Sequence, residues 1–403
     1  MLWDYNHVID LKLGDASAPI KVIPSTLHED LVLMNKNCKG CWSMHGSKWN
    51  PDVKSPLNEV NISHKLDFVY MMHLYEATLE GKYWMLNVCL DSDQPVCSTD
   101  FIVFAIEKAT PWFNVLGDGY IGLAPSNGNK SLDAVHNNIL DQMHFKKMIN
   151  TKVFGVHTHM YNSTEDPSQI RFGGYNEDLL REDHEVVWFK TASSKSWGFE
   201  IISGGLHENL FNTAATNIKH AIIEPGYPYI AMPKLAFVDF VNSMQSAYPE
   251  EPMTCSQNDW CFFYNPCEDV KKHIPDLVFE ILDSNGEQRE LRVPPSSFLF
   301  SDTDYKTKLE VCHVGIIGMK FNDMQMWVFG QAFMENFYTI FDGSDSNNLK
   351  IGLNVRIVSG SETNFTEILA LSICAVLGIV VFCLFVVLCC RHRQEARLEH
   401  AKT

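Results

Sequence analysis

Ala221-Ile222-Ile223-Glu224-Pro225-Gly226 sets three apolar residues directly before a turn that carries one carboxylate. Lys21-Val22-Ile23-Pro24-Ser25-Thr26-Leu27 has a similar outline near the start of the chain. About a hundred residues after each stretch, two apolar residues and a glycine follow, as Tyr120-Ile121-Gly122 and as Val328-Phe329-Gly330. This order and spacing indicate a long-range duplication, with one loop and one supporting segment in each half of the chain.

Strand patterns dominate the sequence up to about residue 355. Short alternating or apolar stretches occur at residues 10–14, 20–23, 68–70 and 84–88, and Gly, Pro, Asn and Asp separate such stretches. These are the patterns of β-strands and turns. Helical periodicity is confined to short segments such as residues 132–148 and 233–244. The sequence therefore predicts a mostly β protein with a few helices.

The duplicated loops resemble the two Asp-Thr-Gly loops of the pepsin-like aspartic peptidases. Other segments resemble parts of that family in the same order: residues 49–51 its Phe-x-Pro motif, residues 170–175 the strand that joins the lobes, and residues 196–199 the motif that opens the second lobe. The resemblance runs from about Tyr5 to Val355. It implies a bilobal double β-barrel, with an N-terminal lobe at residues 1–180 and a C-terminal lobe at residues 181–357.

Neither loop carries the family's aspartate. Ser25 takes the place of the first aspartate and Glu224 that of the second. Aspartic peptidases place two carboxyl groups around one water, so that one holds a proton while the other activates the water. A serine hydroxyl does not titrate usefully. Leu27 replaces a glycine of the first loop, and Pro225 lacks the hydroxyl with which the family bridges its two loops. We therefore predict that the protein does not cleave peptides.

The same resemblance names the residues of a substrate cleft. Thr26 and Gly226 are the retained members of the two loops. A tyrosine covers the cleft in this family, and either Tyr70 or Tyr75 would take that position here, with no glycine nearby to form the usual flap turn.

Other carboxylates near the first loop offer a different alignment. Asp15 and Asp30 are the candidates, but neither precedes a Thr/Ser-Gly pair. The sequence holds 16 histidines and no helical His-x-x-x-His pair, so it predicts no metal site and no cofactor.

Cysteines and sequons indicate the secretory route. Eight cysteines precede residue 313, and an even number is typical of disulfides formed in an oxidising compartment. They are Cys38, Cys41, Cys89, Cys97, Cys255, Cys261, Cys267 and Cys312. The resemblance pairs the first two and the last two, which leaves Cys89–Cys97 and Cys255–Cys261 as local pairs. Asn-x-Ser/Thr sequons for glycosylation occur at Asn61, Asn129, Asn162 and Asn364.

Residues 368–390 form an apolar run. At about 1.5 Å per residue, such a helix can cross a hydrocarbon core of roughly 30 Å. Basic residues follow at once, so we expect a stalk at 358–367, a transmembrane helix at 368–390 and a cytosolic tail at 391–403. This type I orientation needs a signal peptide that the first residues do not show, and we expect a trimmed N-terminus.

A net charge of −17 disfavours a nucleic-acid partner. Three functions then compete. The predicted one is a non-catalytic, membrane-anchored protein of the cell surface or an endolysosomal membrane, which binds a peptide or protein partner in its interlobe cleft. The second is an active endopeptidase with an unusual Ser25/Glu224 site, and the third is a structural surface glycoprotein.

Overall fold

The computed structural model describes residues 8–13, 19–43, 59–70, 75–90, 96–115, 117–126, 138–159, 168–181, 183–206, 209–211, 220–256, 260–303, 308–319 and 326–356. Within these ranges no helix is both long and apolar enough to span a bilayer. The expected stalk, transmembrane helix and tail lie outside the described residues, as do Asn129, Asn162 and Asn364. Residues Met1–Val355 form one compact unit.

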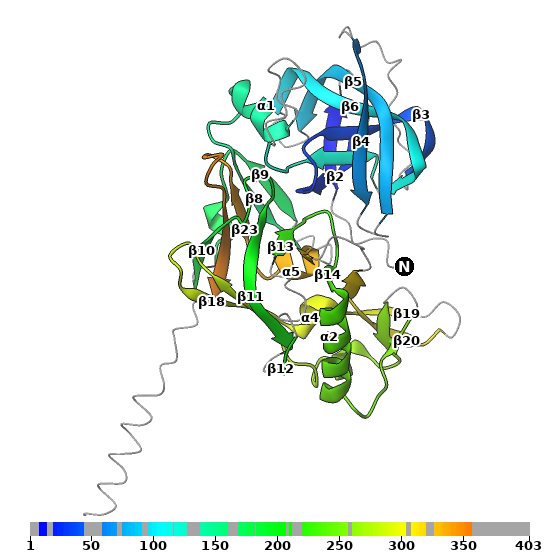
Figure 1. Cartoon of the computed structure of the whole chain (residues 1–403), viewed down its shortest axis with the longest axis vertical. Coiled ribbons are helices and arrows are strands. Elements are labelled where there is room, and N and C mark those ends of the chain that lie inside the picture. The colour runs from blue at the N-terminus through cyan, green and yellow to red at the C-terminus, as the bar shows by residue number, and fades with distance from the viewer. Residues whose placement is uncertain are drawn as a thin grey trace, which may run out of the picture. The chain divides into compact units, whose positions relative to one another are not determined.

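The first half of the chain is built mainly from strands (Figure 1). Its elements are β1 (Ile9–Leu13), β2 (Ile20–Ser25), β3 (Leu31–Ser43), β4 (Glu59–Tyr70), β5 (Tyr75–Leu90), β6 (Val96–Val115), β7 (Gly119–Gly122), α1 (Ile139–Phe145), β8 (Val153–His157), β9 (Gln169–Phe172) and the 3-10 helix η1 (Glu177–Leu179).

The second half adds the longest described helix, α2, and many short strands. Its elements are β10 (His184–Lys190), β11 (Gly198–Leu206), β12 (Asn209–Leu210), β13 (His220–Ile223), β14 (Ile230–Pro233), α2 (Lys234–Ala247), β15 (Thr254–Cys255), β16 (Cys261–Phe263), α3 (Cys267–Val270), β17 (Leu277–Leu282), β18 (Gln288–Val293), α4 (Pro295–Phe298), β19 (Leu299–Thr303), β20 (Glu310–Val314), β21 (Ile316–Met319), β22 (Trp327–Phe329), α5 (Gln331–Met334), β23 (Thr339–Asp342) and β24 (Lys350–Arg356).

The two halves repeat one strand arrangement. In the first sheet β2 pairs with β7 in parallel, β7 with β3 antiparallel, and β3 with β6 in parallel. In the second sheet β13 pairs with β22 in parallel, β22 with β14 antiparallel, and β14 with β21 in parallel. The duplication expected from the sequence is therefore present in the backbone, and each loop follows the first strand of its set.

A glycine ends each supporting segment because a neighbouring loop passes against its backbone. A Cβ atom on Gly122 would lie 2.4 Å from the carbonyl carbon of Glu29, and one on Gly330 would lie 2.1 Å from the carbonyl oxygen of Tyr227. Neither position has room for a side chain. This close passage holds the chain just beyond Ser25 and just beyond Glu224 in place.

The strands next to the first loop, β2 and the start of β3, are buried on both faces. Val22, Leu31 and Leu33 belong to the main hydrophobic core, whereas the intervening Val32 and the neighbouring Ile23 belong to a second cluster. Successive side chains of a strand point to opposite faces. The strands that carry the first loop therefore pack against apolar side chains on both sides.

A five-stranded sheet joins the two halves, with the order β10-β24-β23-β8-β9. It combines strands from either side of residue 180, where the sequence suggests a lobe boundary. The Trp197 indole N–H also donates to the carbonyl of Leu123, at 2.7 Å. The expected division at 180/181 thus falls inside one compact unit, and its exact position stays a prediction.

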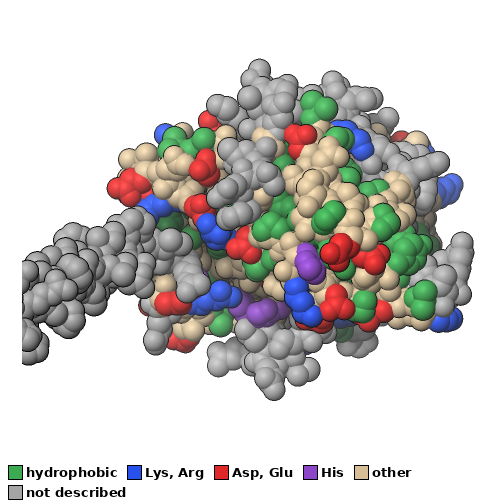
Figure 2. Space-filling view, turned by 90° about the horizontal axis from the view of Figure 1, so that it is seen from below, with side chains coloured by type: hydrophobic (Ala, Val, Ile, Leu, Met, Phe, Trp, Pro, Cys, Tyr) green, Lys and Arg blue, Asp and Glu red, His purple; other side chains and the backbone are tan. Residues whose placement is uncertain are grey.

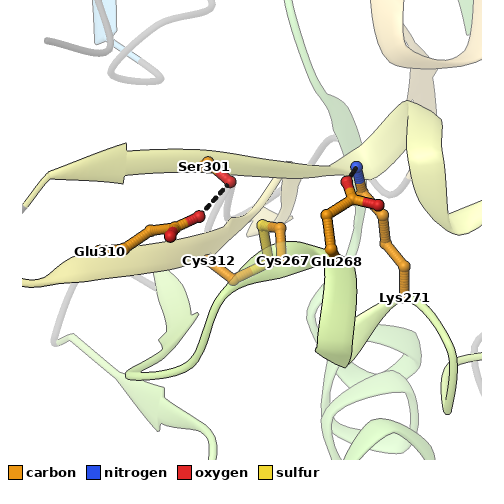
Figure 3. The surroundings of a disulfide bond; sticks show 6 residues. All are labelled: Cys267, Glu268, Lys271, Ser301, Glu310 and Cys312. Atoms are coloured by element: carbon orange, nitrogen blue, oxygen red, sulfur yellow. Dashed lines mark hydrogen bonds and ion pairs between the residues drawn. A yellow bond between two sulfur atoms is a disulfide. The ribbon is translucent and has the colours of Figure 1, made fainter.

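The described cysteines form four disulfides: Cys38–Cys41, Cys89–Cys97, Cys255–Cys261 and Cys267–Cys312. The last one closes the longest loop, with a sequence separation of 45 residues. It ties the start of α3 to β20, beside the hydrogen bond from Ser301 to Glu310 that links β19 and β20 (Figure 3).

Candidate functional site

The structure brings Ser25 and Glu224 together. Ser25 is the last residue of β2, and Glu224 directly follows β13. The Ser25 hydroxyl donates to Glu224 Oε2 at 3.4 Å, across 199 positions of sequence. Both side chains are buried, with exposed fractions of 1% and 2%. The two positions that the sequence aligns with the catalytic aspartates are therefore neighbours in space.

The Glu224 carboxylate lies against Thr26. The Thr26 backbone N–H donates to Glu224 Oε2 at 2.8 Å, and Thr26 Oγ1 lies 2.8 Å from the same oxygen. Thr26 Oγ1 also donates to the carbonyl oxygen of Ile223 at 2.5 Å. The carboxylate therefore joins the two loops through Thr26, whose side chain is 1% exposed.

The second loop closes around the other carboxylate oxygen. The Gly226 N–H donates to Glu224 Oε1 at 3.2 Å. A Cβ atom on Gly226 would lie 2.3 Å from the carbonyl oxygen of Pro24, so this glycine lets the second loop approach β2 closely. From α5, the Gln331 amide donates to the carbonyl of Pro225 at 2.9 Å and supports the loop from the other side.

Burial controls the charge of this carboxyl group. It raises the pKa of Glu224 from an ordinary value of 4.5 to about 7, while the hydrogen bonds from Thr26, Gly226 and Ser25 act in the opposite direction. Desolvation disfavours the ionised form, and hydrogen-bond donors favour it. Because desolvation is the larger effect, Glu224 holds its proton in mildly acidic solution.

A second buried carboxyl follows the first loop. Burial, with the nearby charge of Glu29, raises the pKa of Asp30 to about 7, and a hydrogen bond with Tyr83 opposes the shift. The backbone of Asp30 also forms an isolated antiparallel β-bridge with Asn138, the residue that precedes α1. Sequence reasoning considered Asp30 as a substitute aspartate and did not predict its contact with Tyr83. Its contact with Tyr83 depends on the register of β5, which no local motif reveals. The other alternative, Asp15, lies outside the described residues.

The two candidate cover residues lie opposite each other. Tyr70 ends β4 and Tyr75 begins β5, and the two are paired in the antiparallel register of this hairpin. The residues that connect them lie outside the described part of the chain. Asn61, the first sequon, also lies in β4.

These contacts define what the site can do chemically. One carboxyl group stands between the two loops, and the partner that faces it from β2 is a hydroxyl rather than a second carboxyl. Among the described residues, no group of three or more His, Cys, Asp or Glu side chains could hold a metal ion. The site thus contains one buried carboxyl group, that of Glu224, which is hydrogen-bonded to residues of both loops.

Known proteins are similar in sequence to this chain. A family model for eukaryotic aspartyl proteases matches residues 84–354. Plasmepsin VIII of Plasmodium berghei (strain Anka) is 20% identical over 356 residues, which cover 85% of both chains. Pepsin-2B of Gadus morhua is 22% identical over 342 residues, or 85% of this chain and 93% of its own. Gastricsin of Rattus norvegicus is 20% identical over 360 residues, or 88% of this chain and 82% of its own. The chain belongs to the eukaryotic aspartyl protease family.

Proposed function

We propose that this protein is a membrane-anchored, non-catalytic member of the family that binds a peptide or protein partner. Its site would face the lumen of the secretory pathway or the cell exterior. A fold can keep its shape while its chemistry changes, because function resides in the site.

The arrangement around Glu224 carries the proposal. A carboxylate that activates water must accept a hydrogen bond from that water, and its partner must be a second acid that polarises the carbonyl. Here Glu224 Oε2 already lies near the Thr26 N–H, the Thr26 hydroxyl and the Ser25 hydroxyl. The position across from it belongs to Ser25, which supplies no second acid.

The retained architecture supports a peptide or protein as the partner. The loops, their supporting glycines and the hairpin of β4 and β5 all persist, and the family to which they belong consists of proteases. The face in Figure 2 mixes acidic and basic side chains, and the whole chain has a net charge of −17. Neither feature suits a phosphate backbone, which binds clustered Lys and Arg.

Cleavage is the decisive test. The full-length chain, glycosylated and with its disulfides formed, would be incubated with a fluorogenic peptide library from about pH 3 to pH 7, the range in which carboxyl groups change charge. We expect no turnover, with or without pepstatin. Cleavage that pepstatin blocks and Glu224→Ala abolishes would refute the proposal and support the endopeptidase alternative.

Binding is measured on the same preparation. A phage-displayed random peptide library would be selected at pH 5.5, and enriched peptides would be measured by fluorescence anisotropy. Saturable binding that weakens in Tyr70→Ala or Tyr75→Ala, but not in the control Tyr264→Ala at a 53% exposed position, would support the proposal. A folded protein that neither cleaves nor binds would favour a structural surface glycoprotein.

A further inference from the structure

The Thr26 hydroxyl has one hydrogen but two oxygen neighbours at hydrogen-bond distance. These are the Ile223 carbonyl oxygen at 2.5 Å and Glu224 Oε2 at 2.8 Å. A carbonyl oxygen only accepts, and so does an ionised carboxylate, whereas a protonated carboxyl can donate. If Thr26 donates to Ile223, its contact with Glu224 needs a hydrogen from the carboxyl group. Only a protonated Glu224 satisfies both contacts.

We infer that Glu224 is an acid-dependent brace: its protonated carboxyl donates to Thr26 Oγ1, Thr26 donates to the Ile223 carbonyl, and loss of the proton removes the first of these two hydrogen bonds between the loops. Deprotonation releases one proton to solvent. It leaves two acceptors, the Ile223 carbonyl and the Glu224 carboxylate, facing the single hydrogen of the Thr26 hydroxyl. The Thr26 and Gly226 backbone N–H groups remain as donors in either state.

Burial is the largest influence on the pKa of Glu224, because its neighbours do not titrate in this range. Ser25 faces it from the end of β2, Thr26 from the turn that follows β2, and Gly226 from its own loop, and none of these titrates near neutral pH. Tyr227, whose N–H donates to the Glu224 carbonyl, has a pKa that burial raises above its ordinary value, so it stays neutral. Within the described part of the chain, no charged side chain shifts the pKa of Glu224, and that pKa of about 7 lies where a protonated brace requires it.

The direction of the pH dependence follows from linkage. The unfolded chain ionises Glu224 near pH 4.5, whereas the folded chain retains the proton up to about pH 7. The brace is therefore fully present below pH 4.5 and is lost as the pH rises through 7. Between these two pKa values, each pH unit lowers the folding equilibrium constant tenfold. A rise from pH 4.5 to pH 7 therefore lowers it by up to about 300-fold.

This device would regulate the site described above. The consequence rests on the proposed function: a peptide that spans both loops would bind best in an acidic compartment and would dissociate as the pH approaches neutrality. The brace itself requires no ligand, so its test and the binding test can fail separately.

The test compares the thermal unfolding of the full-length chain from pH 5 to pH 8 in three forms. They are the wild type, Glu224→Gln, which is neutral at every pH, and Glu250→Gln, a control at an exposed position after α2. We expect the wild type and the control to lose stability together as the pH rises, and Glu224→Gln to lose markedly less. Asp30 also titrates in this range, so its contribution remains in all three forms and cancels in the comparison. Parallel profiles for wild type and Glu224→Gln would overturn the inference.

Infrared spectroscopy covers the case in which Glu224→Gln does not fold. In Asp30→Asn, we expect a protonated carboxylic acid band at pH 5.5 that disappears by pH 8.5 with a midpoint of about 7. Absence of that band would overturn the inference without reference to the Gln variant.

Discussion

Replacing Thr26 by valine removes the hydroxyl at the centre of the site and keeps the shape of the side chain. Two contacts are lost, one to the Ile223 carbonyl and one to Glu224 Oε2, and both lie in a region closed to water. A buried hydrogen bond contributes about 0.5–1.5 kcal/mol, and a buried partner left unsatisfied costs about 1–3 kcal/mol. Because both partners are left behind, we expect Thr26→Val to lower the free energy of unfolding by about 2–4 kcal/mol.

Chemical unfolding of the full-length chain at pH 5.5 measures this loss, with Thr26→Ser as the matched control. Serine keeps the hydroxyl and removes one methyl group, which costs about 1 kcal/mol in a buried position. A valine variant no less stable than the serine variant would show that the Thr26 hydroxyl does not join the two loops. The brace at Glu224 would then lose its structural basis as well.

Two further changes test the surroundings of the site. Gly226→Ala would place a Cβ atom 2.3 Å from the Pro24 carbonyl oxygen, so we expect a loss of about 2–3 kcal/mol on chemical unfolding, and a loss below about 0.5 kcal/mol would contradict the close approach of the two loops. Removing a disulfide should cost more when the closed loop is longer. Changing Cys267 and Cys312 to alanine opens a separation of 45 residues and should cost about 4 kcal/mol, against under about 2 kcal/mol for Cys38 and Cys41, which are three apart. Equal losses for the two pairs would refute this explanation.

Much of the fold could be predicted because its signals are local. The alternation at residues 10–14, 20–23 and 84–88 predicts strands that the structure contains as β1, β2 and part of β5. The helical pattern at 233–244 corresponds to α2, which extends to Ala247. The pattern at 132–148 contains only the shorter α1 within the described residues. Apolar periodicity indicates which face of a helix is buried, but it does not determine the residues at which the helix begins and ends.

Long-range pairing is the part that local patterns do not determine. β6 runs for 20 residues and pairs with both β3 and β5, with shifts of register along both pairs. Nothing in its own sequence shows which partners it takes. The same limit explains why the Asp30–Tyr83 contact was missed, since it needs β3, which begins just after Asp30, and β5 to be placed on either side of β6 in one sheet.

The site shows why single substitutions in a motif should be interpreted together. Glu224 and Pro225, taken one at a time, each depart from the loop that the family resemblance predicts: the first is one methylene longer than aspartate, and the second lacks a hydroxyl and an N–H. In the structure the longer side chain of Glu224 lets its carboxyl contact Thr26 N and Thr26 Oγ1, so that the two loops stay joined although Pro225 provides no hydroxyl. The two changes therefore compensate each other structurally. On the proposed non-catalytic function, a carboxyl engaged in that contact is not available to a substrate, and we therefore expect that restoring an aspartate at position 25 alone would not produce cleavage.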